Sequence, residues 1–182
     1  MLKKAFQDIH RDTIEQSKKG DAKAQYQLYS LYAKAMFNIC MRMLSVREDA
    51  EDALQEAFTE VFDKLSSFRY ESAFGAWVKR IVVNTCINRL NRKHPELVLS
   101  DIASAASPEE EPEMEDLELQ VQQVLSAVEQ LPDGYRLILN LYLFEGYDHR
   151  EISEILGISE STSKTQYFKA RRKVKEIIIN ES

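Results

Sequence analysis

Apolar side chains recur every three or four residues over most of this 182-residue sequence, and that period constrains the fold more than any other feature. One series runs from residue 28 to residue 39, and a second runs from residue 50 to residue 65. A third helix is expected at 76–92, directly after Gly75. Side chains three and four apart share one face of a helix, so these series predict amphipathic α-helices. Strand-like alternation does not occur, and the sequence therefore predicts an all-α fold.

The charges are segregated along the chain, and this segregation divides it into modules. The net charge is −6, yet residues 47–64 carry seven acids and two bases, whereas residues 69–93 carry six bases and one acid. Residues 95–118 contain nine acids, three prolines and no Lys or Arg, which is typical of a solvated, extended linker. We therefore predict two small helical domains, residues 1–94 and 119–182, joined by an acidic flexible linker at 95–118.

The composition also excludes several classes of protein. An acidic chain is not expected to bind nucleic acid strongly and non-specifically by itself. No apolar run approaches ~18 residues and the N-terminus lacks an apolar signal core, so we expect a cytoplasmic protein with no membrane insertion of its own. Cys40 and Cys86 lie within helical series without CxxC spacing, which favours reduced packing residues.

Residues 148–179 carry the signals of two helices joined by a tight turn. Asp148 can cap a short helix that ends at Leu156, and Gly157 can adopt the positive φ that the turn needs. Ser159 can then cap a longer second helix. This arrangement predicts a helix-turn-helix, whose second helix enters the major groove of DNA.

The second helix divides into an inward stripe and a basic outward face. The inward stripe consists of Ser163, Tyr167, Ala170, Val174 and Ile177. The residues expected to contact DNA are Ser161, Lys164, Thr165, Phe168, Lys169, Arg171 and Arg172. An outward Phe168 suits contact with a thymine methyl group. The alternative is an ordinary solvated amphipathic helix.

Three segments, in this order, resemble the sigma-70 family of RNA polymerase sigma factors, in its extracytoplasmic-function (ECF) group. DAEDALQEAFTEVFDKL at 49–65 resembles the helix that docks on core RNA polymerase. FRYESAFGAWVKRIVVNTCINRLNRKH at 68–94 resembles the promoter −10 segment, and EISEILGISESTSKTQYFKARRKVKE at 151–176 resembles the −35 helix-turn-helix. The resemblance implies a protein that binds core RNA polymerase and directs it to promoter DNA.

The resemblance also implies roles for individual residues of the acidic helix. In the family this helix binds the arginine-rich coiled coil of the beta-prime subunit, and Asp52, Gln55 and Glu56 stand at the matching positions. Arginine pairs well with carboxylate and amide oxygens, which accounts for these residue types. The alternative is a solvated acidic face without a partner.

The −10 segment supplies a second set of expected contacts. Its residues are Phe68, Tyr70, Phe74, Arg80, Asn84, Asn88, Arg89, Arg92 and Lys93. The resemblance places the two asparagines near exposed bases, and the basic residues 89–93 can contact backbone phosphates. The three aromatic rings can stack on unpaired bases. For Phe74, and also for Trp77, the alternative is a place in the core.

The sequence departs from the family pattern at several positions of the helix-turn-helix. Ser163 stands where an aliphatic residue is usual, Gln166 and Lys169 stand where arginine is common, and Ser153 replaces the usual alanine. Sigma factors of this group are usually held by an anti-sigma factor, so the resemblance implies such a partner as well.

Two other functions remain as alternatives. The first is a helix-turn-helix regulator that acts without polymerase, with the N-terminal module as a ligand or dimer domain. The second is an enzyme in which bundle carboxylates hold two metals, which requires Glu-x-x-His pairs. The residues three before His10, His94 and His149 are Gln7, Asn91 and Gly146, so we expect no metal, no cofactor and no catalytic activity.

Overall fold

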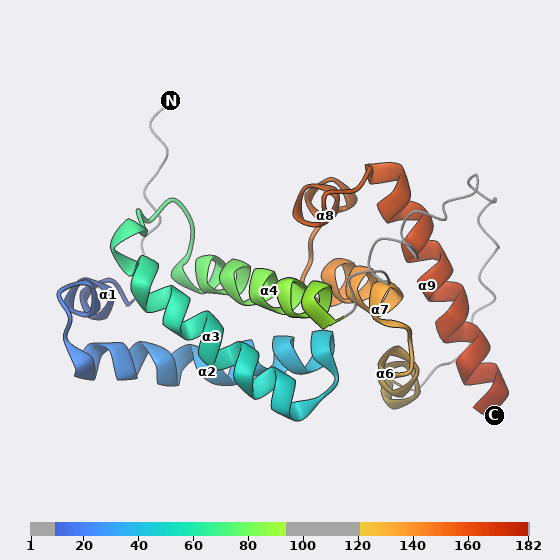
Figure 1. Cartoon of the computed structure of the whole chain (residues 1–182), viewed down its shortest axis with the longest axis horizontal. Helices are drawn as coiled ribbons and strands as arrows, with labels where there is room; N and C mark the ends of the chain where they lie inside the picture. The colour runs from blue at the N-terminus through green and yellow to red at the C-terminus, as the bar shows by residue number, and fades with distance from the viewer. Residues whose placement is uncertain (1–9, 94–120, 182) are drawn as a thin grey trace. The chain divides into compact units, whose positions relative to one another are not determined.

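Figure 1 shows the computed structural model of the chain, which describes residues 10–93 and 121–181. Within these residues the regular elements are helices and no strand occurs, which confirms the predicted all-α fold. The chain divides into two units, Met1–Arg89 and Leu90–Ser182, and each is described here by itself. The predicted linker at 95–118 lies outside the described residues, so the bounds of the linker and of the two domains stay predictions.

Within residues 10–93 the N-terminal module has four α-helices and one short 3₁₀ turn. They are α1 (Arg11–Lys18), α2 (Ala22–Leu44), α3 (Arg47–Lys64), η1 (Leu65–Ser67) and α4 (Phe74–Lys93). Asp21 begins α2, because its carboxylate accepts hydrogen bonds from the backbone N–H groups of Lys23 at 2.8 Å and Ala24 at 3.0 Å. None of the described helices has the length and apolar character that crossing a membrane requires.

The core of this module forms where α1 and α3 pack against α2. Ala50, Ala53 and Ala57 lie at spacings of three and four on α3 and are buried, and such small side chains allow close approach of a neighbouring helix. Tyr29 of α2 meets Phe58 of α3 edge to face, with ring centroids 4.8 Å apart. Cys40 and Cys86 are both buried as thiols, in agreement with the packing role predicted for them.

The described residues of the C-terminal module, 121–181, form four α-helices and one π-helical turn. They are α6 (Val121–Glu129), α7 (Asp133–Leu139), η2 (Asn140–Phe144), α8 (His149–Leu156) and α9 (Glu160–Glu181). Their apolar core includes Ala127, Val128, Leu131, Leu139, Ala170, Val174 and Ile178.

Arg136 holds α6 to α7 from inside this module. Its guanidinium donates hydrogen bonds to the carbonyl oxygens of Glu129 at 3.1 Å and Leu131 at 2.7 Å, and it pairs with Asp133. The carbonyl groups at the end of a helix have no partner within the helix, so Arg136 supplies the donors that the end of α6 needs.

The predicted helix-turn-helix is present, with each of its local signals in the expected place. Asp148 and Glu151 form a reciprocal capping box at the start of α8. Gly157 ends α8 with a φ of 68°. Ser159 then accepts a hydrogen bond of 2.9 Å from the backbone N–H of Thr162 at the start of α9.

Candidate nucleic-acid interface

Four polar residues predicted to face DNA form one exposed row along α4. Arg80, Asn84, Asn88 and Arg92 are four residues apart and all are exposed. Other positions of the helix, including Val78 and Val82, are fully buried and fix α4 against the core. At 1.5 Å of rise per residue the row spans roughly 18 Å.

Arg89 lies on a different side of α4 from this row. Its Nη2 atom is 3.0 Å from Oδ2 of Asp52, and its Nη1 atom is 3.2 Å from Oε2 of Glu56. Both acids belong to α3, so the ion pairs join two helices. A residue predicted to contact DNA thus pairs with two residues predicted to contact polymerase.

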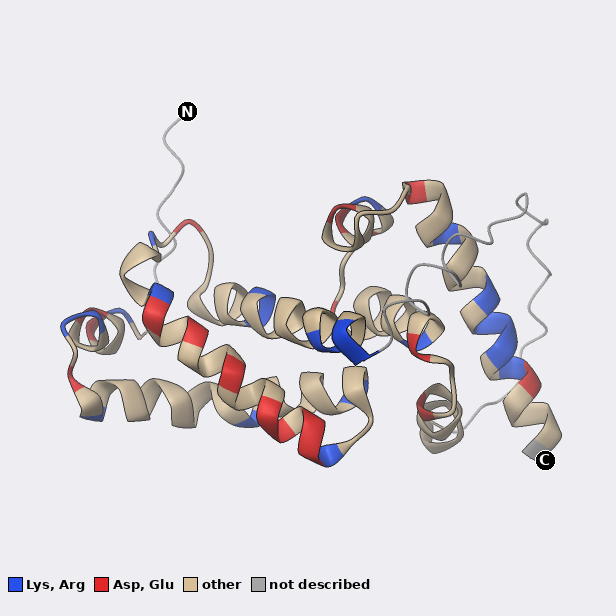
Figure 2. Cartoon of the chain, in the orientation of Figure 1, with Lys and Arg blue, Asp and Glu red and all other residues tan. Residues whose placement is uncertain are grey.

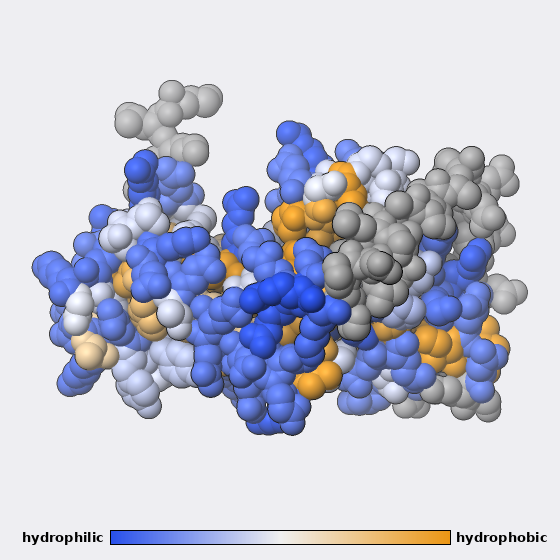
Figure 3. All heavy atoms as spheres, in the orientation of Figure 1, coloured by the Kyte–Doolittle hydropathy of each residue, from blue (hydrophilic) through white to orange (hydrophobic). Residues whose placement is uncertain are grey.

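The acidic face of α3 is available to a partner. Asp52, Gln55 and Glu56 are exposed, while the adjacent positions Ala53 and Leu54 are buried. Figure 2 shows red segments of Asp and Glu along α3, and blue segments of Lys and Arg near the C-terminal end of α4. The face of the N-terminal module seen in Figure 3 is mostly hydrophilic, with hydrophobic residues reaching it in small areas.

The structure corrects the expectation for the three aromatic rings before and at the start of α4. Phe68, Tyr70 and Phe74 are 4%, 7% and 0% exposed. Phe68 packs on Tyr70, Phe74 and Trp77 with ring centroids 4.8, 5.3 and 5.2 Å apart. The faces of each ring pack against neighbouring side chains, so the three rings offer no stacking surface in this conformation. For Phe74, the alternative of a place in the core therefore holds. The rings are buried by the hydrophobic effect. The sequence around them has no helical period that would indicate which side chains face inward.

Gly75 lies beside this cluster, where there is little room for a side chain. A Cβ atom at that position would lie 3.0 Å from Cε1 of Tyr32. Tyr32 packs edge to face on Phe74, with ring centroids 5.3 Å apart. A larger residue would therefore push Tyr32 away from the aromatic core.

Helix α1 fastens the same segment through contacts that the sequence did not indicate. Lys18 Nζ donates a hydrogen bond of 2.9 Å to the carbonyl oxygen of Phe68 and lies 4.7 Å from the ring centroid of Tyr70. The Tyr70 hydroxyl donates a bond of 2.6 Å to Glu15 Oε1. This bond, with the bond from Lys18, lowers the pKa of Glu15. Tyr70 has a φ of 58°, an uncommon value for a non-glycine residue, and these contacts hold it there.

The predicted DNA-facing side of α9 is partly exposed and partly packed. Ser161, Lys164, Phe168 and Arg172 are exposed, whereas Thr165, Lys169 and Arg171 are half-buried. Two of the cations pair along their own helix, Lys164 with Glu160 at 2.7 Å and Arg172 with Glu176 at 3.8 Å. The guanidinium of Arg171 lies 5.7 Å from the ring centroid of Tyr167.

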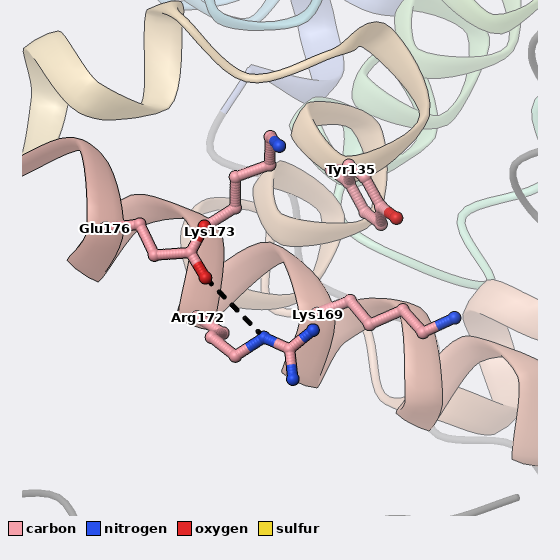
Figure 4. Close-up of a pocket in the computed structure, with 5 residues that line it drawn as sticks. All are labelled: Tyr135, Lys169, Arg172, Lys173 and Glu176. Carbon is pink, nitrogen blue, oxygen red and sulfur yellow. Dashed lines mark ion pairs between the residues drawn. The ribbon is translucent and has the colours of Figure 1, made fainter.

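An open pocket of about 220 Å³ lies where α7 approaches the basic side of α9. Figure 4 shows Tyr135 of α7 facing Lys169, Arg172, Lys173 and Glu176 of α9. Lys169 and Arg172 are among the residues that the sequence predicts to contact DNA, whereas Tyr135 and Lys173 are not. Neighbouring cations on one wall suit an anionic group such as a phosphate.

The structure explains why Ser163 departs from the aliphatic pattern. Ser163 is fully buried, and its hydroxyl is 3.0 Å from Nδ1 of His149 at the start of α8. The His149 ring stacks on Tyr142, with centroids 4.5 Å apart and planes 19° apart. Burial, followed by the charge of Lys164, lowers the pKa of His149 and favours its neutral form. The pair thus ties α8 to the inward side of α9.

Metal ligands do not gather in the described part of the chain. No group of three or more His, Cys, Asp or Glu residues within 10–93 and 121–181 is arranged to hold a metal ion.

Two family sequence models match the chain over both modules. Sigma-70 region 2 matches residues 28–95, which include α3 and α4. Sigma-70, region 4 matches residues 121–174, which include the helix-turn-helix. The matched segments cover more than half of the sequence and include all or nearly all of each of the three motifs described above. The chain belongs to the sigma-70 family of RNA polymerase sigma factors.

Curated relatives place it within the ECF group of that family. The ECF RNA polymerase sigma factor SigW of Bacillus subtilis is 30% identical over 177 residues, which are 90% of this chain and 93% of that protein. The ECF RNA polymerase sigma-E factor of Haemophilus influenzae is 30% identical over 176 residues, 91% of this chain and 93% of that protein.

Solved structures agree with the sigma-factor fold. The sigma factor RpoE of Bartonella quintana, in complex with the anti-sigma factor NepR, superimposes with a TM-score of 0.56 at 22% identity, covering 86% of this chain and 98% of that one. CnrH in complex with the cytosolic domain of CnrY gives a TM-score of 0.57 at 21% identity, covering 96% of this chain and all of that one. At these identities the likeness concerns the fold alone.

Proposed function

We propose that this chain binds core RNA polymerase and directs it to promoters by recognising their −10 and −35 elements, and so initiates transcription. The observation that carries the proposal is the division of surfaces within one small module. An exposed acidic face lies on α3, and an exposed row of Arg and Asn lies on α4. One surface suits a basic protein partner, and the other suits a nucleic-acid strand.

The acidic face is the proposed polymerase contact. Asp52 and Glu56 are one helical turn apart with Gln55 beside them, so their oxygens can accept hydrogen bonds from neighbouring guanidinium groups of the beta-prime coiled coil. Promoter DNA carries the same sign of charge as this face and is repelled by it. The partner of α3 is therefore protein.

The exposed row on α4 is the proposed −10 contact. Arg80 and Arg92 lie at the two ends of the row, with Asn84 and Asn88 between them. The two cations can contact backbone phosphates, and the two amides can form hydrogen bonds with base edges. The row's span of roughly 18 Å matches about five nucleotides at 3.4 Å each. Lys93 extends the positive charge at the end of the helix.

Helix α9 is the proposed −35 contact. Lys164 and Phe168 are exposed on its N-terminal half, which a helix-turn-helix places in the major groove. Arg172 and Lys169 line the pocket beside Tyr135, farther along the helix, where a backbone phosphate suits their charge.

An anti-sigma factor is the further partner that we propose. The sigma factor RpoE of Bartonella quintana, which has a similar fold, was determined in complex with the anti-sigma factor NepR. A partner that covers α3 would block the proposed polymerase surface, and one that covers α9 would block the proposed −35 surface.

Reconstitution with core RNA polymerase tests the proposal. Purified chain added to core enzyme should produce discrete transcript starts on genomic DNA of its own source, with shared sequences at −10 and −35. The triple change Asp52→Lys, Gln55→Ala and Glu56→Arg should abolish co-purification with core enzyme, since it places positive charge against an arginine-rich surface.

A charge-matched variant on the same helix serves as the control. Glu51→Lys with Glu60→Arg reverses the same number of charges, and these two acids pair with Arg47 and Lys64 of their own helix. That variant should still bind core enzyme. A chain that binds promoter DNA specifically without polymerase, and whose triple variant keeps full activity, would instead support the stand-alone regulator.

A further inference from the structure

The starting observation is the guanidinium fork that joins α4 to α3. Arg89 donates one hydrogen bond to each of Asp52 and Glu56, at 3.0 and 3.2 Å. Its side chain is 21% exposed, whereas those of Asp52 and Glu56 are 65% and 44% exposed. The acids are therefore open to an approaching partner, while the guanidinium is largely shielded from the solvent side.

This geometry brings the two proposed interfaces into competition for the same groups. A guanidinium of polymerase that approaches Asp52 and Glu56 meets carboxylates that already have a guanidinium partner. A promoter phosphate that approaches Arg89 meets a cation that points at α3. The other basic residues at this end of α4, Arg92 and Lys93, are exposed, so the shielding is particular to Arg89.

We propose that Arg89 is an exchangeable internal counter-ion, which pairs with Asp52 and Glu56 in the free chain and is released to promoter phosphate when polymerase arginines take its place. The proposal rests on the proposed function, because it needs α3 to dock on polymerase. Binding of polymerase and binding of the promoter strand are then linked, and each strengthens the other by the same factor.

The size of the effect follows from the exposure of the acids. Ion pairs at a protein surface are weak, because water and salt screen them and their side chains lose freedom. Two such pairs predict a coupling of about two- to tenfold at low salt. The device therefore favours the complex that holds both partners, and it does not block the binding of either one alone.

A competition assay for core RNA polymerase separates this device from a simple structural tie between α3 and α4. Full-length Arg89→Gln competes with labelled wild-type chain for core enzyme at low salt. If Arg89 occupies the docking site, Arg89→Gln should bind core enzyme about two- to tenfold more tightly than wild type. If Arg89 only orients the acids, the variant should bind equally or more weakly, and that result would overturn the proposal.

A second assay measures the released cation directly, without polymerase. The probe is a fluorescent 20-nucleotide single-stranded DNA, and the variant is Asp52→Asn with Glu56→Gln. This variant should bind the DNA about two- to tenfold more tightly than wild type, and the added change Arg89→Gln should remove that gain. The control Glu51→Gln with Glu60→Gln removes the same charge, but any gain it shows should persist in the Arg89→Gln background.

The outcomes distinguish this inference from the proposed function. Loss of core binding by Asp52→Asn with Glu56→Gln supports docking through α3 whatever Arg89 does. If that loss occurs while Arg89→Gln fails to tighten core binding, the exchange is wrong and the docking stands. If Asp52→Asn with Glu56→Gln binds core enzyme as wild type does, the docking itself is wrong. Arg89→Lys keeps the charge but lacks the guanidinium fork, so its affinity for core enzyme should lie between those of wild type and Arg89→Gln. This variant replaces Arg89→Gln if the latter does not fold.

Discussion

The cations predicted to contact DNA are paired differently in the two modules. In the N-terminal module Arg89 pairs with acids 33 and 37 residues earlier in the chain, and so joins two helices. In the C-terminal module, Lys164 and Arg172 of the proposed DNA-facing side pair with Glu160 and Glu176 of the same helix. Pairs within one helix break at little cost when a phosphate arrives, whereas a pair between helices links two binding surfaces.

The aromatic residues show the same contrast. Phe68 and Phe74 lie beside the proposed −10 surface and are buried in a shared cluster. Phe168 lies on the proposed −35 surface and is 37% exposed. Beside its proposed DNA surface the first module therefore buries Phe68 and Phe74, whereas the second leaves Phe168 exposed. Each prediction below tests one part of this comparison.

The largest effect is expected for the buried ring. Phe74→Ala should lower the free energy of unfolding of the N-terminal module by about 3–5 kcal/mol, because it opens a cavity in the aromatic core. Phe168→Ala should cost less than about 1 kcal/mol and should weaken binding to −35 DNA instead. Trp77 is the single tryptophan of the chain, so its fluorescence in urea reports the N-terminal module. Equal stability losses in the two variants would remove the contrast.

The second effect belongs to the C-terminal module alone. Arg136→Ala should lower its free energy of unfolding by about 2–4 kcal/mol, because the carbonyl oxygens of Glu129 and Leu131 lose their donor. Peptide-resolved hydrogen exchange should show faster exchange over 121–139, with no change in the Trp77 transition.

The control for this prediction is Arg150→Ala, which removes an exposed arginine whose partner, Glu154, is on the same helix at 3.5 Å. It should have an effect below about 0.5 kcal/mol. A loss in Arg150→Ala as large as that in Arg136→Ala would show that Arg136 does not act through the end of α6.

The sequence predicts the fold wherever a local signal is sufficient. Asp148 and Ser159 cap helices in the structure as expected, and Gly157 has the positive φ that the turn needs. These features depend on residues within four positions of one another. The exposed row on α4 follows in the same way from its spacing.

The rest could not be predicted, because it depends on contacts between distant segments. Nothing near Arg89 in the sequence indicates that its partners lie on α3. The burial of Phe68 and Tyr70 occurs in a segment without helical periodicity, and the fastening residues Glu15 and Lys18 come from α1. In the sequence, Ser163 is only a departure from the family pattern. Its partner, His149, lies 14 residues earlier and is known only from the structure.

The third prediction concerns the fastening of Tyr70 and its dependence on pH. Tyr70→Phe removes the bond to Glu15 and should cost the N-terminal module about 1 kcal/mol at pH 7, since the acid is charged but partly exposed. The folded state holds the pKa of Glu15 below its ordinary value of 4.5. The unfolded chain therefore takes up this proton first, and stability should fall as the pH drops below about 4.5.

Urea titrations followed by Trp77 fluorescence at several pH values measure this effect. Tyr70→Phe should flatten the fall below pH 4.5, because the main cause of the low pKa of Glu15 is removed. Ser72→Ala, on the same segment but without a bond to α1, serves as a control and should keep the wild-type slope. An unchanged slope in Tyr70→Phe would contradict the role given to this bond.

The smallest effect is expected at His149 in the C-terminal module. Burial and Lys164 hold the pKa of His149 below its ordinary value of 6.5 in the folded state. As the pH falls below about 6.5, the unfolded chain gains the proton before the folded chain does. The module should therefore lose stability from about pH 6.5 down to the lower pKa that His149 has in the folded state. Because the ring is only half-buried, the total loss should stay below about 1 kcal/mol.

Two substitutions separate the proton from the hydrogen bond. His149→Asn can keep a polar contact with Ser163 but cannot titrate, so it should remove this part of the pH dependence between pH 5 and pH 7.5. Ser163→Ala loses the contact and keeps the imidazole, so it should lower stability while the pH dependence persists. Hydrogen exchange over 149–170 follows the C-terminal module in both variants. If His149→Asn keeps the wild-type pH slope, the acid sensitivity of this module arises elsewhere, and the His149–Ser163 contact ties α8 to α9 without responding to pH.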